Sequence, residues 1–316
     1  MAIPKTMRAQ QYDARDNKLH LNEIPVPQPR EHELLVKIGC ASLCHSDIMH
    51  FEPNDQNLIL GQNPLTIGHE GTGRVIATGS GDLATKFKEG DAVGFICAVD
   101  CCFECYPCKN VHNMWCATGN VNMQGFSVDG YFAEYAVVDA RGAMVLPANL
   151  DPRESAPLFC AGLTAYHAIA DCELAPGSWI ATIGCGGLGH MGIQYAKAMG
   201  YKVIGVDITD AAIEEAKSCG ADYTFNSMTD KGYKEKIKEL TGGGVHAAVN
   251  FTASKKAYSD CPALVKPGVG MIMVVGIPLQ PIEFNGLDIA MGRYRIKGSN
   301  NGSQYPCFFF TSWAGG

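Results

Sequence analysis

The stretch WIATIGCGGLGHMG, residues 179–192, decides the fold of one half of the chain. An apolar run is followed at once by glycines and then by residues at helical spacing; the turn holds Gly184, Gly186, Gly187, Leu188 and Gly189. The next apolar run, YKVIGVD, ends at Asp207, 18 residues beyond the last of these glycines. Such a strand, glycine turn and helix place a pyrophosphate on the helix N-terminus, and the carboxylate can bind ribose hydroxyls.

This pattern predicts a dinucleotide site. A carboxylate at Asp207 would repel a 2′-phosphate, which favours NAD over NADP. The alternative is a glycine-rich turn that serves only the packing of a helix on a strand.

The surrounding sequence, residues 151–300, alternates between apolar strands and amphipathic helices. One predicted helix runs from 188 to 199, with a shared face of Leu188, Met191, Tyr195 and Met199. A second places Tyr233, Ile237 and Leu240 on one face and stops at the glycines that begin with Gly242. Strands alternating with such helices predict an α/β domain, a doubly wound parallel sheet covered on both faces.

Residues 1–150 follow a different pattern. The runs ELLVKIGC, GRVIATGS, DAVGFICAV and YFAEYAVVD are short, apolar and bounded by Gly, Pro, Asn or Asp. This spacing is typical of an irregular, mostly β domain.

Composition limits the classes of partner and compartment. The chain has 316 residues, 25 basic and 32 acidic, with a net charge of −7 and no long run of one sign. Neither a nucleic acid nor a membrane is expected as a partner. The N-terminus has no secretory apolar region, so we expect a cytoplasmic protein, where clustered cysteines bind metal more often than they form disulfides.

Five of the 14 cysteines fall in CCFECYPCKNVHNMWC, residues 101–116. Four of them have the spacing of a closed tetrahedral zinc site: Cys102, Cys105, Cys108 and Cys116. A closed site leaves no position for substrate and is structural. A disulfide pair is the alternative, and Cys101 is left over as a free thiol.

A second set of metal donors is dispersed along the chain. It consists of Cys44 in CASLCHSDIMH, His69 with Glu70 in TIGHEGTG, and Cys160 in APLFCAGLTAYHA. A catalytic zinc needs about three protein ligands and an open position. Each residue alone could equally be an ordinary buried or polar side chain.

Five motifs follow one another along the chain: CHSD, GHEGTG, the four-cysteine cluster, CAGLTAYHA and GCGGLG. With these motifs in this order, the sequence resembles the zinc-dependent alcohol dehydrogenases of the medium-chain dehydrogenase/reductase family, in particular the microbial and fungal type. The resemblance implies a groES-like catalytic domain and a Rossmann domain with the active site between them. It also implies that Cys44, His69 and Cys160 bind the catalytic zinc and that Glu70 can approach it.

The same resemblance implies the activity: NAD(H)-dependent interconversion of alcohols and aldehydes or ketones, in a homodimer or homotetramer. Ser46 would take the substrate proton, Asp47 would orient His69, His45 would face the pyrophosphate, and Thr164 would pack against the nicotinamide. Without the resemblance, Ser46 and Asp47 would be read as turn or capping residues.

Three features depart from the relatives. Their relay histidine is replaced by Met49, with His50 one position later, either a displaced relay residue or a solvent-exposed histidine. Cys97 stands where yeast-type enzymes have a tryptophan, which would open the pocket to bulky or aromatic substrates. Residues 301–316, NGSQYPCFFFTSWAGG, form an atypical tail. The alternatives are therefore a specialised biosynthetic dehydrogenase, or a non-catalytic or impaired protein that binds zinc and NAD.

Overall fold

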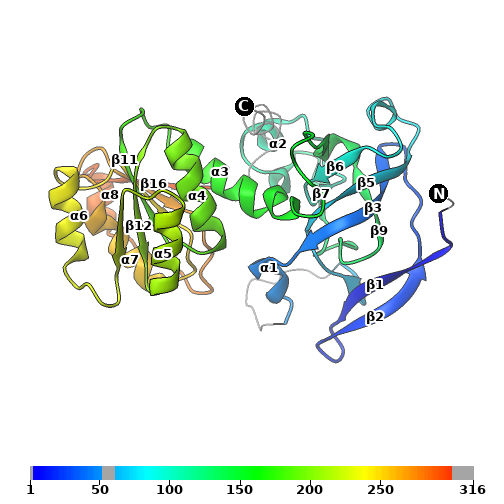
Figure 1. Ribbon diagram of the computed structural model, residues 1–316, viewed down its shortest axis with the longest axis horizontal. Coiled ribbons are helices and arrows are strands. Elements are labelled where there is room, and N and C mark those ends of the chain that lie inside the picture. The colour runs from blue at the N-terminus through cyan, green and yellow to red at the C-terminus, as the bar shows by residue number, and fades with distance from the viewer. Residues whose placement is uncertain (1–2, 52–60, 301–316) are drawn as a thin grey trace. The chain divides into compact units, whose positions relative to one another are not determined.

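The computed structural model describes residues 3–51 and 61–300 (Figure 1). The chain falls into two compact units that divide between Cys160 and Ala161. The expected tail at 301–316 lies outside the described residues. In the part of the chain that is described, no helix has the length and apolar character that crossing a bilayer requires.

The first unit consists of antiparallel sheets with short helices between them. Its sheets have the strand orders β2-β1-β4, β10-β6-β5-β3-β9 and β7-β8. Its strands are β1 (Thr6–Asp13), β2 (Lys18–Pro25), β3 (Glu33–Ser42), β4 (Leu65–Thr66), β5 (Glu70–Thr78), β6 (Ala92–Phe95), β7 (Ala98–Val99), β8 (Asn122–Met123), β9 (Tyr135–Asp139) and β10 (Ala143–Val145). Its helices are α1 (His45–Ile48), η1 (Ala84–Lys86), α2 (Tyr106–Asn110), η2 (Asn113–Trp115), η3 (Ala140–Gly142) and η4 (Ala156–Phe159).

Core clusters lie on both faces of the five-stranded sheet, one around Leu34 and Val36 and the other around Leu35. Phe95 of β6 and Tyr131 meet edge to face, with ring centroids 4.8 Å apart, and both are fully buried. Gly71 of β5 makes room for them, since a Cβ there would lie 2.8 Å from both rings. Close approach at this glycine therefore fixes the packing beneath the start of β5.

The second unit is an α/β domain, as predicted. Its six strands are parallel throughout, in the order β13-β12-β11-β14-β15-β16. These are β11 (Trp179–Ile183), β12 (Lys202–Asp207), β13 (Tyr223–Asn226), β14 (Ala247–Asn250), β15 (Met271–Val274) and β16 (Arg295–Gly298). The helices are α3 (Ala161–Ala170), α4 (Gly187–Ala198), α5 (Asp210–Ser218), α6 (Tyr233–Thr241), α7 (Lys255–Leu264) and α8 (Gly286–Ala290).

Helix α4 packs beside both α3 and α5, and α6 packs beside α7 (Figure 1). The strand order changes direction at β11 and β14, the point at which doubly wound sheets bind ligands. The turn between β11 and α4 therefore lies at the carboxyl end of a central strand, where a cofactor is expected.

The buried face of α4 differs from the predicted one. Of the predicted face only Tyr195 is buried, whereas Gly189, Gly192, Ile193 and Ala196 form the contact with the sheet. Counting apolar side chains missed this face because two of its members are glycines, which bring the helix close to Phe251 and Gly184. In α6, Tyr233 and Ile237 are buried as predicted, Thr241 takes the place expected of Leu240, and the helix stops at Gly242 in a left-handed conformation.

Candidate functional site

The dispersed donors come together in the first unit. Cys44 precedes α1, His69 and Glu70 lie at the start of β5, and Cys160 follows η4. One ligand atom from each of these four residues lies within 4.8 Å of the others. Two thiols, an imidazole and a carboxylate are the donor set that a zinc ion accepts, so the residues present fit the predicted metal.

Asp47 connects two of these ligands. Its Oδ1 lies 2.8 Å from Nδ1 of His69, and its Oδ2 accepts a hydrogen bond of 2.9 Å from the backbone N–H of Cys44. Asp47 caps α1 in this way while fully buried. Because the Nδ1 of His69 is engaged by Asp47, its Nε2 is the nitrogen left for a metal.

Electrostatics in this cluster favour the metal-binding charge state at Cys44, whereas His69 and Cys160, whose pKa values are both raised, must release a proton to coordinate a cation. A hydrogen bond from the Cys160 thiol, aided by His69 and opposed by burial, lowers the pKa of Cys44 to about 3. Burial opposes protonation of His69, but hydrogen bonds to Asp47 and Cys44 raise the pKa of this imidazole to about 10. Cys44 is thus held as a thiolate, the form of cysteine that coordinates a cation.

Cys160 is positioned by a packing contact with β6. The residue before it, Phe159, is buried, and its ring occupies the space in which a Cβ at Gly94 would lie, 1.8 Å from the ring. The helical turn η4 ends at Cys160, whose N–H bonds the carbonyl of Pro157. The glycine in β6 therefore allows η4 to bring Cys160 to the other donors.

The remaining residues with predicted roles lie in α1 and α3. His45 is exposed and Ser46 half-buried at the start of α1, next to Cys44. Thr164 is buried on α3 in the second unit. Their roles toward substrate and cofactor stay predictions.

His50 is buried, so the solvent-exposed alternative is wrong. Only 9% of the residue is exposed, and Nε2 lies 2.8 Å from the carbonyl oxygen of Gly125. The ring packs between Tyr12 and Phe126, at centroid distances of 5.7 and 5.3 Å. Burial, opposed by this hydrogen bond, lowers the pKa of His50 below its usual range. The imidazole is thus held neutral in an aromatic cluster.

Cys97 does not open a pocket. It is 1% exposed and belongs to the core cluster that contains Phe95 and Tyr131. Burial raises the pKa of its thiol to about 12. The expectation that this position adds room for substrate is wrong, because neighbouring core side chains close over it.

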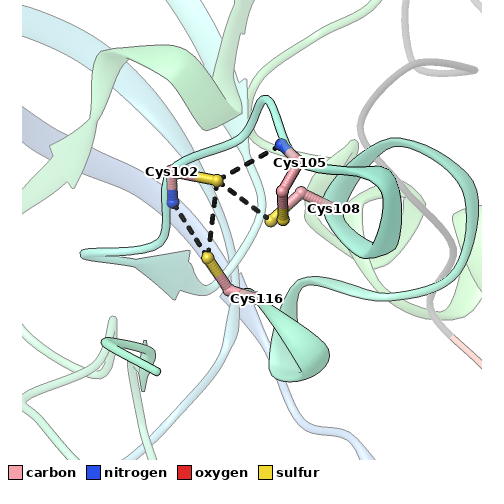
Figure 2. A group of neighbouring side chains, drawn as sticks. All are labelled: Cys102, Cys105, Cys108 and Cys116. Atoms are coloured by element: carbon pink, nitrogen blue, oxygen red, sulfur yellow. Dashed lines mark hydrogen bonds between the residues drawn. The ribbon is translucent and has the colours of Figure 1, made fainter. Parts of the chain in front are cut away.

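The four clustered cysteines surround a common point (Figure 2). Sγ of Cys102 lies 3.5 Å from that of Cys116 and 3.9 Å from that of Cys108, which is too far for a disulfide. Backbone N–H groups donate to the sulfurs, including that of Cys105 to Cys102 at 3.3 Å and that of Ala117 to Cys105 at 3.4 Å. Amides directed at sulfur stabilise thiolates, so this cluster also fits a metal.

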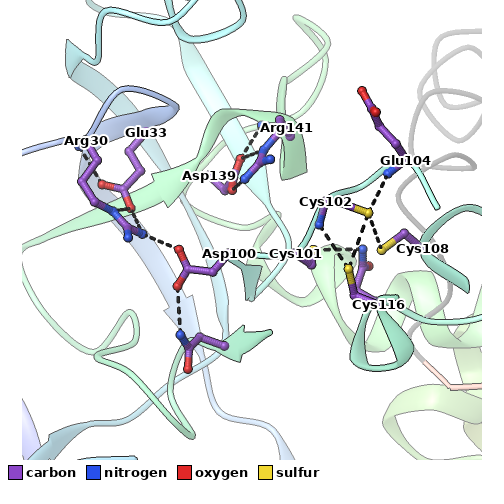
Figure 3. A network of polar contacts seen from close by, with 12 residues as sticks. Arg30, Glu33, Asp100, Cys101, Cys102, Glu104, Cys108, Cys116, Asp139 and Arg141 are labelled. Carbon is purple, nitrogen blue, oxygen red and sulfur yellow. Dashed lines mark hydrogen bonds and ion pairs between the residues drawn. The ribbon is translucent and has the colours of Figure 1, made fainter. Parts of the chain in front are cut away.

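Cys101 lies outside that set and is held by Asn113. The amide of Asn113 donates to its sulfur at 3.3 Å, and burial raises the pKa of this thiol to about 11 (Figure 3). Nearby, Arg30 and Asn122 both donate to Asp100, at 2.8 and 2.9 Å. The segment between β7 and β8 that carries the four cysteines is called here the cysteine lobe. These contacts hold its base, where β7 pairs with β8.

The glycine turn has the geometry expected of a phosphate site. Gly184 has a φ of +85°, and a Cβ at Gly189 would lie 1.8 Å from the carbonyl oxygen of Gly184. A Cβ at Gly186 or Gly187, in contrast, would meet no protein atom within 4 Å. Packing therefore explains Gly184 and Gly189, whereas the open space at Gly186 and Gly187 is suited to the close approach of a ligand.

Asp207 accepts three hydrogen bonds from backbone N–H groups, which the spacing did not predict. Its Oδ2 accepts from the N–H of Cys185 at 2.8 Å, and its Oδ1 accepts from the N–H groups of Ile208 and Thr209 at 2.6 and 3.0 Å. The carboxylate thereby joins the glycine turn to the end of β12.

Known protein families match both units. Residues 30–148 match the family "Alcohol dehydrogenase GroES-like domain", and residues 187–311 match the family "Zinc-binding dehydrogenase". An alcohol dehydrogenase from Geobacillus stearothermophilus is 38% identical over 286 residues, covering 90% of this chain and 82% of that protein.

Solved structures of alcohol dehydrogenases are also similar to this chain. The alcohol dehydrogenase of Aeropyrum pernix aligns with a TM-score of 0.84 and 26% identity, over 98% of this chain and 90% of that one. The benzyl alcohol dehydrogenase of Acinetobacter calcoaceticus also has a TM-score of 0.84 and 26% identity, over 98% and 88%. The chain therefore belongs to the zinc-type medium-chain alcohol dehydrogenases, enzymes that interconvert alcohols with aldehydes or ketones.

Proposed function

We propose that this chain oxidises alcohols and reduces aldehydes or ketones with NAD(H), using a zinc ion held by Cys44, His69 and Cys160. The observation that carries the proposal is the convergence of these donors, with Glu70, within 4.8 Å. When bound, the zinc supplies positive charge that favours loss of the hydroxyl proton of an alcohol.

The chain's own residues hold and orient the reacting groups. Asp47 fixes the His69 ring through Nδ1 and fixes Cys44 through its backbone N–H, so both ligands keep their direction. Ser46 follows two residues after Cys44, and we assign its hydroxyl to receive the substrate proton. His45 and Thr164 are assigned to the cofactor. The neutral, buried His50 donates its Nε2–H to the carbonyl of Gly125, which leaves Nδ1 as the nitrogen that could accept a proton in the relay.

The test is a screen of NADH oxidation with straight-chain, branched and aromatic aldehydes. Turnover that is lost on chelation and restored by Zn²⁺ is expected. If chelation removes the metal of the dispersed donors and turnover continues, the proposal is contradicted.

We propose that NAD(H) is preferred over NADP(H), because the Asp207 carboxylate would repel a 2′-phosphate. Asp207→Asn is expected to shift the ratio of kcat/KM for NADPH over NADH upward by about tenfold, since one unit of charge is removed. The amide oxygen can still accept from the N–H of Cys185, but the amide nitrogen cannot accept from the N–H groups of Ile208 and Thr209. Because the ratio compares two cofactors on the same variant, any change in the shape of the turn affects both. An unchanged ratio would contradict this role for Asp207.

A second zinc is proposed for Cys102, Cys105, Cys108 and Cys116. Four thiol donors and the backbone N–H groups directed at them support a closed structural site. Such a site shapes the lobe and leaves no position for substrate.

We also propose that this chain accepts bulky or aromatic substrates. The benzyl alcohol dehydrogenase among the similar structures supports this proposal. The burial of Cys97 argues against that residue as the source of the space. Comparing kcat/KM for ethanol and benzyl alcohol is the test, and a strong preference for ethanol would contradict it.

We propose a homodimer or homotetramer assembled through β16. This strand pairs only with β15 among the described strands, and Ile296 on it is 37% exposed. The adjacent α8 has no buried residue. Light scattering is expected to give at least twice the 33.9 kDa of the chain, and Ile296→Lys is expected to lower it toward one chain. A monomeric wild-type protein would contradict the proposal. None of the described cysteines forms a disulfide, which supports a reducing compartment such as the cytoplasm.

A further inference from the structure

Ser42 is a polar residue without a predicted role, and it lies against the carboxylate of Glu70. Ser42 ends β3 and Glu70 begins β5, and the two residues pair directly in the antiparallel ladder. Residues that pair in this way point to the same face, with Cβ atoms about 5 Å apart. The Ser42 hydroxyl donates a hydrogen bond to Oε2 of Glu70.

This pairing depends on an irregularity in β3. Ile38 pairs with Gly73, but Cys40, two residues later, pairs with Thr72, one residue earlier in β5. Without that extra residue Ala41 would oppose Glu70, and a methyl group would replace the hydroxyl. The bulge therefore places a hydrogen-bond donor opposite the carboxylate.

The hydroxyl matters because Glu70 is both buried and close to the metal donors. Glu70 is 2% exposed, and its carboxylate oxygen lies within 4.8 Å of the ligand atoms of Cys44, His69 and Cys160. A buried carboxylate is costly unless it is hydrogen-bonded or binds a cation. The hydrogen bond from Ser42 stabilises the buried carboxylate without a cation. It therefore competes with binding of the carboxylate to a metal ion.

We propose that Ser42 is a positioning residue that holds the Glu70 carboxylate and limits its entry into the metal's open position. The inference rests on the proposed metal at Cys44, His69 and Cys160. Ser42 acts through Glu70 and needs no contact with substrate.

The test uses the full chain loaded with Co²⁺, whose visible spectrum reports the ligands of the ion. In Ser42→Ala the carboxylate loses this hydrogen bond and should occupy the open position more often. Imidazole, a neutral ligand for that position, is then expected to bind about tenfold more weakly, the scale of one hydrogen bond to a charged group. Release of Co²⁺ to a chelator is expected to slow. Ser42→Thr keeps the hydroxyl and should behave as wild type.

Combining Ser42→Ala with Glu70→Gln removes the competing carboxylate and should restore imidazole binding to the level of Glu70→Gln alone. Equal imidazole affinity and equal Co²⁺ release in wild type and Ser42→Ala would overturn the inference while leaving the metal centre intact. So would a Ser42→Thr protein that behaves like Ser42→Ala. A wild-type chain that holds Co²⁺ only at the cysteine lobe would overturn the proposed metal centre as well.

Discussion

Replacing Cys160 with serine is expected to lower kcat/KM for alcohol oxidation by more than about a thousandfold, because a lost zinc removes several kcal/mol of charge stabilisation. A serine has nearly the size of cysteine but is a poor ligand at neutral pH. Phe159 should still pack at Gly94, so the loop is expected to keep its place. Steady-state kinetics and metal analysis of the same preparation test the prediction, with one zinc per chain lost.

The matched control is Cys172→Ser. Cys172 is also buried, at 2% exposed, but lies in the second unit, where its thiol donates to the carbonyl oxygen of Ala168 at 3.2 Å. A serine hydroxyl can make the same hydrogen bond, so activity and zinc content should be unchanged. Full activity in Cys160→Ser would show that Cys160 is not a required ligand. Equal losses in both variants would point to general damage from a buried serine.

Alanine substitutions at Gly186 and Gly189 in the cofactor turn are expected to separate an effect on NADH affinity from an effect on the free energy of unfolding. At Gly186 the added methyl meets no protein atom within 4 Å, and the φ of −74° suits any residue. We expect the free energy of unfolding to change by no more than about 0.5 kcal/mol. The affinity for NADH should fall about a hundredfold, because the methyl blocks the approach of the pyrophosphate to the backbone.

Gly189→Ala is expected to show a different result. Its methyl would lie 1.8 Å from the carbonyl oxygen of Gly184, so the helix must move away from the turn. A loss of about 3 kcal/mol in the free energy of unfolding is expected, which thermal unfolding without cofactor measures. NADH fluorescence titration measures the binding. If Gly186→Ala bound NADH as tightly as the wild type, the phosphates would not lie at this turn.

The sequence predicted the parallel sheet well because its signals are local. Apolar strands, the glycine turn and the stop at Gly242 each depend on residues close together in the chain. The contact face of α4 was predicted wrongly because Gly189 and Gly192 pack through their backbone, which a count of apolar side chains cannot detect.

Prediction of the metal centre had a different basis. Residues 44, 69 and 160 are far apart, and the resemblance to a family, not their spacing, selected them. In the structure, Asp47 joins two of them and the fit of Phe159 at Gly94 brings the third. These contacts, like the burial of His50 against Tyr12 and Phe126, arise from tertiary packing.

Ser42 could not have been identified from the sequence, because its partner depends on strand register. A shift of one residue between Ile38 and Cys40 decides whether Ser42 or Ala41 faces Glu70. Periodicity within one strand carries no information about an irregularity in its pairing.

The zinc content of the purified chain tests the central claim most directly. Two zinc ions per chain are expected, one at Cys44, His69 and Cys160 and one at the four clustered cysteines. Cys160→Ser should retain only one, with the loss of NADH-dependent aldehyde reduction. A wild-type chain that holds a single zinc, and still reduces aldehydes after that zinc is removed, would contradict the account.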